Sequence, residues 1–213
     1  MPRLLTELAQ SRHTLKVLAE TPLNVQTDRA AIEQMLAAAG SAPFHLIPAP
    51  EHREGSTMPG IVPWRFRLLD VAACRALRAW LVSREDKSTY PRLLNACTTL
   101  ALVTWLPDAP KSPLDAEAGE IFAGTQQNTE HLAATGAAVQ TFLLAATERG
   151  LPTFWASGGP LKSSAAFEHL GIPPRELLAG AVFVFPPEHA GAETMQSKLR
   201  DKRPAPAEWS CWL

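Results

Sequence analysis

Two short segments of the chain carry groups that could bind an anion. In residues 11–16, Arg12 and Lys16 could reach the same phosphate, with the hydroxyl of Thr14 between them. Residues 156–160, Ala-Ser-Gly-Gly-Pro, open a loop with several free backbone amides, which suits an anionic or heteroaromatic ligand. A basic hexapeptide is more often a solvated helix end. On the residues alone, both interpretations of 11–16 therefore stay open.

Other kinds of chemistry find little support. Ser157 lacks the Gly-x-Ser-x-Gly elbow of a hydrolase nucleophile. His45 and His52 share a loop with Glu51 and Glu54, but no histidine has a partner at metal-ligand spacing on a recognisable helix, so we expect no metal site. Neither a Gly-x-Gly-x-x-Gly turn nor a P-loop is present, which argues against a Rossmann or Walker nucleotide site.

The composition is that of a globular protein. The chain has 213 residues, 46% of them hydrophobic and 19% charged, with a net charge of −1, so we expect one domain over residues 1–213 and no nucleic-acid partner. No uncharged apolar run is long enough to cross a bilayer, and residues 1–13 lack the apolar core of a signal peptide, so we expect a cytoplasmic protein without membrane contact. The three cysteines are odd in number and widely spaced, which predicts neither a disulfide framework nor a metal site.

A central helix should position the amide-rich loop. The apolar stripe over residues 132–146 has helical spacing, and no charge lies between Glu130 and Glu148, so a helix over 132–149 should be buried nearly all round. Gly150 ends it, and residues 151–155 read as a short strand leading into the loop.

Further elements follow from periodicity and from turn residues. Thr27 is expected to cap a helix that Gly40 ends. The other expected helices cover residues 3–10, 71–83, 114–127 and 163–169, and the other expected strands cover 64–69, 98–106 and 177–185. The loop over 41–63 is unusually long for a compact domain, and the tail over 198–213 is basic, then proline-rich, then aromatic.

Four segments, in order along the chain, resemble the nitroreductase family of FMN-dependent oxidoreductases. Residues 12–16 resemble its Arg-x-Ser-x-Arg/Lys phosphate motif, and 42–45 with 63–66 are similar to its Ala-Pro and Pro-Trp-x-Phe segment. The central helix with 150–155 resembles its Gly-Leu-Gly-x-x-Trp signature, and 202–204 its C-terminal basic dipeptide and proline. The Ala-Pro-x-His sequence at 42–45 and the Trp-x-Ser-Gly sequence at 155–158 resemble those of a compact branch of this family. The resemblance implies an α+β fold of three α/β/α layers, with a mixed, mostly antiparallel sheet around the long central helix.

The resemblance also implies cofactor contacts, although no catalytic side chain. The FMN phosphate and ribityl end would be held by Arg12, His13, Thr14 and Lys16, with a second phosphate contact from Lys202 or Arg203. Three residues, Pro43, Phe44 and His45, would lie near the flavin, and His45 would come from the partner subunit. The isoalloxazine would be lined, with backbone amides toward its N5/O4 edge, by Trp155, Ala156, Ser157 and Gly158.

Two features depart from the family pattern. Val62 stands where the family has a glutamine that hydrogen-bonds the flavin or the ribityl chain, and the loop over 46–62 is expanded by roughly a dozen residues against the family's usual spacing. The loop is either a surface insertion without a role or, as we expect, part of the substrate entrance.

The function implied by the resemblance is hydride transfer from NAD(P)H through FMN to a nitroaromatic, quinone or enone, by a ping-pong mechanism in a homodimer with flavin at the interface. The central helix would form much of the core and of the dimer contact. Two alternatives stay open. One is a flavin enzyme of the same fold for dehalogenation, desaturation or flavin breakdown, and the other is a degenerate, non-catalytic dimer that binds a ligand or protein.

Overall fold

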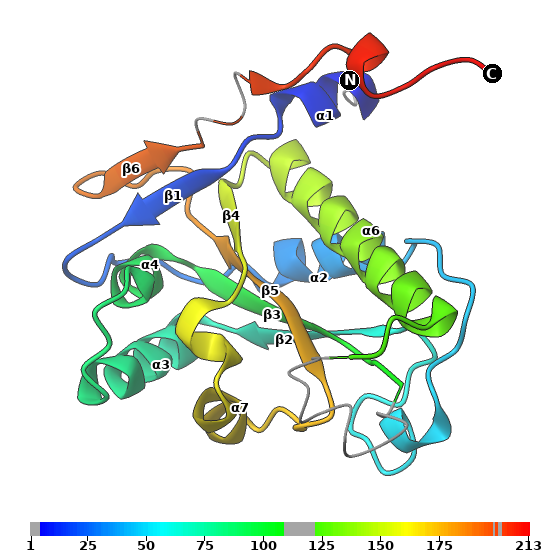
Figure 1. Cartoon of the computed structure of the whole chain (residues 1–213). Coiled ribbons are helices and arrows are strands. Elements are labelled where there is room, and N and C mark those ends of the chain that lie inside the picture. Colours follow the sequence, from blue (N-terminus) through cyan, green and yellow to red (C-terminus); the bar gives the residue numbers. More distant parts are fainter. Residues whose placement is uncertain (1–4, 109–121, 198, 200–201) are drawn as a thin grey trace.

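A four-stranded antiparallel sheet forms the middle of the molecule (Figure 1). The computed structural model describes residues 5–108, 122–197, 199 and 202–213. The sheet order is β2 (Trp64–Leu69), β3 (Thr99–Trp105), β5 (Leu177–Val184) and β4 (Thr153–Ala156). A separate ribbon pairs β1 (Leu15–Leu18) with β6 (Glu193–Gln196), and within the described residues the one parallel pairing is an isolated bridge between Thr14 and Thr153.

Helices cover both faces of the sheet, which gives the expected three layers. On one face lie α2 (Arg29–Ala39) and α6 (Gln126–Glu148), and on the other lie α3 (Val71–Ser83), α4 (Tyr90–Ala96) and α7 (Ser164–Leu170). Alternate residues of each central strand serve the two cores, as strand geometry requires. Leu100 and Leu102 of β3 join the α3/α4 core, whereas Ala101 and Val103 join the α2/α6 core.

Shorter elements complete the fold. Single 3₁₀ turns are η1 (Pro50–His52), η2 (Gly159–Lys162) and η4 (Pro206–Glu208). Helix α1 (Leu5–Ser11) stands at the edge of the molecule beside the C-terminal segment and has no buried residue (Figure 1). In the described part of the chain, no helix combines the length and apolar character needed to cross a membrane.

The central helix differs from its sequence-based description. It begins at Gln126; Val139, Leu143 and Ala146 of the expected stripe are buried, and so are His131, Thr135, Ala138 and Phe142. Leu132, which we placed in the stripe, is 40% exposed, and Ala133 and Gln140 are also exposed. Among the described residues, the helix is therefore not buried all round.

Two local assignments are also corrected. The side chain that caps α2 is Asp28, which accepts a hydrogen bond from the Ala31 amide, while the Thr27 hydroxyl instead donates to the Thr98 carbonyl and accepts from the Val71 amide. Strands β1 and β6 and helix α4 were not expected, since each is short and shows little periodicity. The expected helix over 114–127 lies largely outside the described residues.

Candidate functional site

The β1–β6 ribbon brings the two basic segments together. Leu15 pairs with Gln196, so the residues just before β1 face the residues just after β6. They enclose a cavity of about 210 Å³, lined by Arg12, His13, Thr14, Gln196, Ser197, Leu199 and Arg203. The ring nitrogen Nδ1 of His13 donates to the Ser11 carbonyl, at 3.1 Å, which orients the imidazole at the edge of this cavity. Two guanidinium groups, an imidazole and hydroxyls in a pocket of this size match the chemistry of a phosphate.

The two lysines expected at the phosphate do not line this cavity. Lys16 lies on β1 with its amino group 4.8 Å from the centre of the Phe154 ring, a cation–π contact with β4. Lys202 is exposed next to Arg203. Sequence spacing suggested that Arg12 and Lys16 could share a phosphate, but Arg12 precedes β1 and lines the cavity, whereas Lys16 lies on β1 and contacts Phe154.

The pyrrole edge of Trp155 closely approaches a glycine of the neighbouring strand. A Cβ atom at Gly180 would meet the indole Nε1 at 2.0 Å and Cδ1 at 2.6 Å, so only glycine allows this approach. The indole is 40% exposed, which leaves a planar aromatic surface at the sheet edge. Such a surface is suited to contact with a planar heteroaromatic ring. In the sequence, Gly180 stands inside the expected strand over 177–185, and nothing there indicates this contact.

The turn after Trp155 is held by Tyr90 of α4. Gly158 and Gly159 have φ of 116° and 48°, and a Cβ at Gly159 would meet the Tyr90 ring at 2.7 Å. Burial raises the pKa of the Tyr90 phenol, and the Gly158 amide opposes that rise by donating to its oxygen. Ala156 is buried and Ser157 is exposed.

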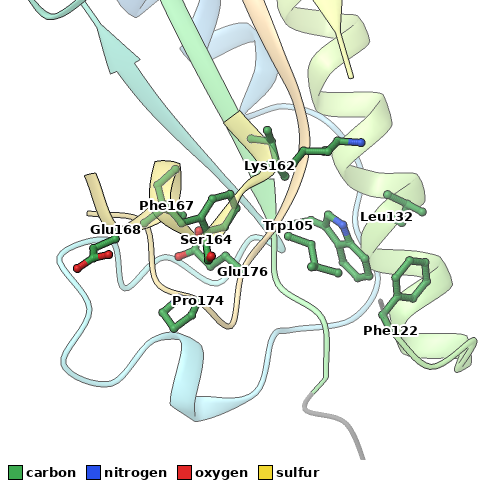
Figure 2. A pocket seen from close by; sticks show the side chains of 13 residues that line it. Trp105, Phe122, Leu132, Lys162, Ser164, Phe167, Glu168, Pro174 and Glu176 are labelled. Atoms are coloured by element: carbon green, nitrogen blue, oxygen red, sulfur yellow. The ribbon is translucent and has the colours of Figure 1, made fainter. Parts of the chain in front are cut away.

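A larger cavity of about 890 Å³ begins beside this turn. Its walls come from the ends of β3 and β5, from η2 and α7, and from the N-terminal part of α6 (Figure 2). A Cβ at Gly158 would meet Leu178 at 2.5 Å and Lys162 at 3.0 Å, and both of these residues line the cavity. The cavity and the Trp155–Gly158 turn are therefore contiguous.

A buried ion pair forms one side of the cavity. Both carboxylate oxygens of Glu176 accept from Arg67, at 2.7 and 2.9 Å, and one also accepts from the Thr104 hydroxyl. Glu176 is 5% exposed. Its charge is balanced within the wall, because a bidentate guanidinium occupies both oxygens. The sequence gave no signal for this pair, whose partners are 109 residues apart.

The long loop is anchored rather than free. His52 is buried and its Nε2 donates to the Pro107 carbonyl at 2.7 Å, while His131 of α6 donates through Nδ1 to the adjacent Leu106 carbonyl at 2.8 Å. Both contacts lie directly after Trp105, which lines the larger cavity. The loop thus contacts the segment that directly follows the cavity-lining Trp105. In the residues that the structure describes, no cluster of His, Cys, Asp and Glu could hold a metal ion.

Arg65 fixes the end of this loop. Its guanidinium donates to the carbonyls of Gly60, Val62 and Trp64, at 2.7 to 2.9 Å. Burial lowers the pKa of Arg65, and nearby Glu176 opposes that shift. The Val62 side chain packs in an apolar cluster that includes Trp64 and Phe44. No side-chain amide is available at this position, as expected from the sequence.

The remaining predicted residues, Pro43, Phe44 and His45, precede this loop. Phe44 packs edge-on against Trp64, with ring centroids 5.8 Å apart, and exposed His45 contacts Glu130 of α6 through Nδ1 at 2.8 Å. Pro43 is exposed. Neither the 210 Å³ nor the 890 Å³ cavity is lined by these three residues. Within one chain, the predicted site is therefore divided into separate parts.

Comparison with known proteins identifies the same fold. Residues 10–184 match the model of the nitroreductase family, whereas no curated protein matches the sequence significantly. The nitroreductase-like family protein of Bacillus cereus is similar in structure, with a TM-score of 0.63, 20% identity and coverage of 96% of this chain and 97% of that one.

Two further solved structures are similar over nearly their whole lengths. A proposed nitroreductase of Desulfovibrio desulfuricans, in complex with FMN, has a TM-score of 0.62 at 17% identity, covering 100% of this chain and 98% of that one. The nitroreductase CinD of Lactococcus lactis, in complex with nicotinic acid, has a TM-score of 0.60 at 16% identity, covering 95% and 99%. At these identities, the likenesses establish the fold.

Proposed function

This chain belongs to the nitroreductase family of flavin oxidoreductases, and we propose that it uses FMN to carry hydride from NAD(P)H to a nitroaromatic, quinone or related acceptor. When bound, FMN would supply the redox chemistry, by accepting a hydride and passing the electrons on in a ping-pong cycle. The observation that carries the proposal is the cavity formed by Arg12, His13, Thr14 and Arg203, next to β4, which carries the exposed indole of Trp155.

In this proposal the chain's own residues bind and orient the cofactor. Arg12 and Arg203 hold the phosphate, and their positive charge offsets its negative charge in a site partly shielded from water. Trp155 provides a flat surface for the isoalloxazine, and the turn over 156–159, braced by Tyr90, presents backbone groups to the ring edge. Residues 1–213 act as one domain, and no side chain acts as a general base.

We further propose that the protein is a homodimer with the flavin at its interface. Helix α1 has no buried residue, every residue from 202 to 213 is exposed, and large apolar side chains are uncovered there: Leu5, Leu199, Trp209 and Trp212. Exposed apolar surface of this extent marks an interaction site. A second copy would also cover the small residues of α6 and could supply His45 to the partner's flavin.

The loop over 46–62 is assigned to the substrate entrance. Its buried His52 and its two carbonyls bound by Arg65, those of Gly60 and Val62, hold it in a defined conformation, which a surface insertion without a role does not need. The loop is anchored at Pro107, two residues beyond Trp105, and Trp105 lines the larger cavity.

The absorption spectrum of the freshly purified protein tests the proposal most directly. We expect bound flavin, and bleaching of its visible band when NADH or NADPH is added without oxygen. Arg12→Ala should weaken FMN binding about ten- to a hundredfold, because it removes a charged hydrogen-bond donor. Arg29→Ala, on the exposed surface of α2, serves as the matched control.

Each result separates the possible classes. A colourless protein that takes up no added FMN would contradict every flavin-enzyme assignment and favour the non-catalytic alternative. Bound flavin that neither nicotinamide reduces would favour dehalogenation, desaturation or flavin breakdown. Unchanged FMN affinity in Arg12→Ala would refute the phosphate assignment alone.

A further inference from the structure

The larger cavity has a composition suited to a particular class of ligand. Its volume of about 890 Å³ lies within the range of small-molecule sites. Its walls are mostly apolar, and Trp105 and Phe122 meet edge to face with ring centroids 4.8 Å apart. Apolar aliphatic and aromatic side chains complete them: Leu132, Phe167, Ile172, Pro174, Leu177 and Leu178. A planar aromatic ring fits such walls, because aromatic edges and faces pack against one another.

The charged side chains that line the cavity differ in whether a neighbouring charge neutralises them. Glu176 is neutralised by Arg67 within the wall, so it does not repel an anion strongly. Lys162 of η2 also lines the cavity, and among the described residues no carboxylate forms an ion pair with it. Figure 2 shows the Lys162 amino group pointing toward α6, whereas the carboxylate of Glu168 points to the opposite side of the cavity. Lys162 is therefore a cation without an ion-pair partner in the described part of the chain, at a cavity with mostly apolar walls.

Lys162 is also placed next to the proposed flavin site. Its Cγ lies 3.0 Å from where a Cβ of Gly158 would be, and Gly158 belongs to the turn that would face the isoalloxazine. A ligand whose anionic group contacted Lys162 would have its ring in the cavity beside that turn. This is where a molecule receiving electrons from the flavin would need to lie.

We propose that this cavity binds the electron acceptor and selects planar aromatic molecules that carry one carboxylate, through the amino group of Lys162. The inference rests on the proposed function, since it names the acceptor class for the same site. The apolar walls remove the ring from water, and the single cation sets the orientation of the ring by fixing its anionic end. A neutral ring of the same shape would lose this contact and bind more weakly.

The preference can be measured by calorimetric binding of two probes, 4-nitrobenzoate and the neutral 4-nitrobenzamide. In the wild-type protein with FMN added, we expect the carboxylate to bind about five- to tenfold more tightly, the size of a charge-assisted contact in a partly exposed site. Lys162→Gln should abolish this difference. Lys87→Gln, which changes an exposed lysine elsewhere, should retain it.

A second variant tests the cavity itself. Phe122→Ala removes part of one aromatic wall at a residue that is 36% exposed, so folding should tolerate it. Both probes should then bind more weakly while their ratio is unchanged. Equal binding of the two probes to the wild type, or a preference that survives in Lys162→Gln, would overturn the inference.

The same titration without FMN distinguishes this inference from the proposed function. A protein that takes up no flavin refutes the function, yet the ratio of the two probes still decides whether Lys162 selects a carboxylate. If 4-nitrobenzoate binds only to the flavin-free protein and FMN excludes it, the cavity belongs to the flavin, and the acceptor assignment is wrong.

Discussion

Thr14 forms a parallel bridge with Thr153, the first residue of β4. This single pairing places the Arg12–Thr14 segment beside β4, the strand that carries Trp155. The 210 Å³ cavity and the exposed indole are thereby fixed to the same part of the sheet, although Thr14 and Thr153 are 139 positions apart in the sequence. An elongated ligand with an anionic end and an aromatic end could span both.

Arg203 and Lys202 offer a comparison of two adjacent cations. Arg203 lines the 210 Å³ cavity and Lys202 does not, so Arg203→Ala should weaken FMN binding about tenfold or more, whereas Lys202→Ala should change it little. The quenching of FMN fluorescence on titration with protein measures both affinities. Equal losses in the two variants would mean that general positive charge, rather than the cavity, holds the phosphate.

Gly180 should not tolerate a side chain. In Gly180→Ala the new methyl group would lie 2.0 Å from Trp155 Nε1 and 2.8 Å from the Ala156 carbonyl oxygen, so we expect a loss of about 1–3 kcal/mol in the free energy of unfolding. Urea unfolding checks this loss. Adding Trp155→Ala should recover part of this loss, because it removes the contact with the indole. Recovery should be incomplete, because the contact with the Ala156 oxygen remains. No recovery in the double variant would show that the indole is not the obstacle.

Glu176 should be more important for stability than an exposed acid. Glu176→Gln leaves the Arg67 guanidinium, with 16% of its side chain exposed, without its counter-charge, and we expect a loss of about 3–5 kcal/mol. Glu148→Gln removes an exposed pair with Arg149 and should cost at most about 1 kcal/mol. Chemical denaturation of the two variants gives the comparison, and similar losses would contradict the buried pair's role.

The cysteines predict how stability changes at alkaline pH. Burial raises the pKa of the Cys97 thiol well above its usual range, with a further rise from neighbouring Cys74. The unfolded chain therefore loses this proton first, so the native state binds more protons and the free energy of unfolding falls as the pH rises above about 9. Denaturant unfolding at several pH values measures this, and the free energy of unfolding should depend less on pH in Cys97→Ala than in the wild type.

A thiol assay provides an independent check on the same residues. Cys74 and Cys97 are buried whereas Cys211 is exposed, so one of the three thiols should react rapidly in the native protein and all three in denaturant. Rapid reaction of more than one thiol in the native state would contradict the burial on which the pH prediction rests.

The sequence by itself determined the main elements and their order. Helix α3 begins and ends where its apolar periodicity does, and the continuous apolar runs at 98–106 and 177–185 became the two central strands, because buried strands must be apolar on both faces. Resemblance to a family extended this to the three-layer fold, which is confirmed. The cofactor contacts stay predictions.

Tertiary structure decided what local patterns could not contain. Pairing of β1 with β6 brought Arg203 rather than Lys202 to the cavity, and the packing of β1 beside β4 placed Lys16 over Phe154. The contact of Trp155 with Gly180, the brace from Tyr90 and the Arg67–Glu176 pair all join residues distant in sequence. Periodicity reports which face of an element is apolar, whereas only the assembled sheet determines which distant side chains meet at its edge.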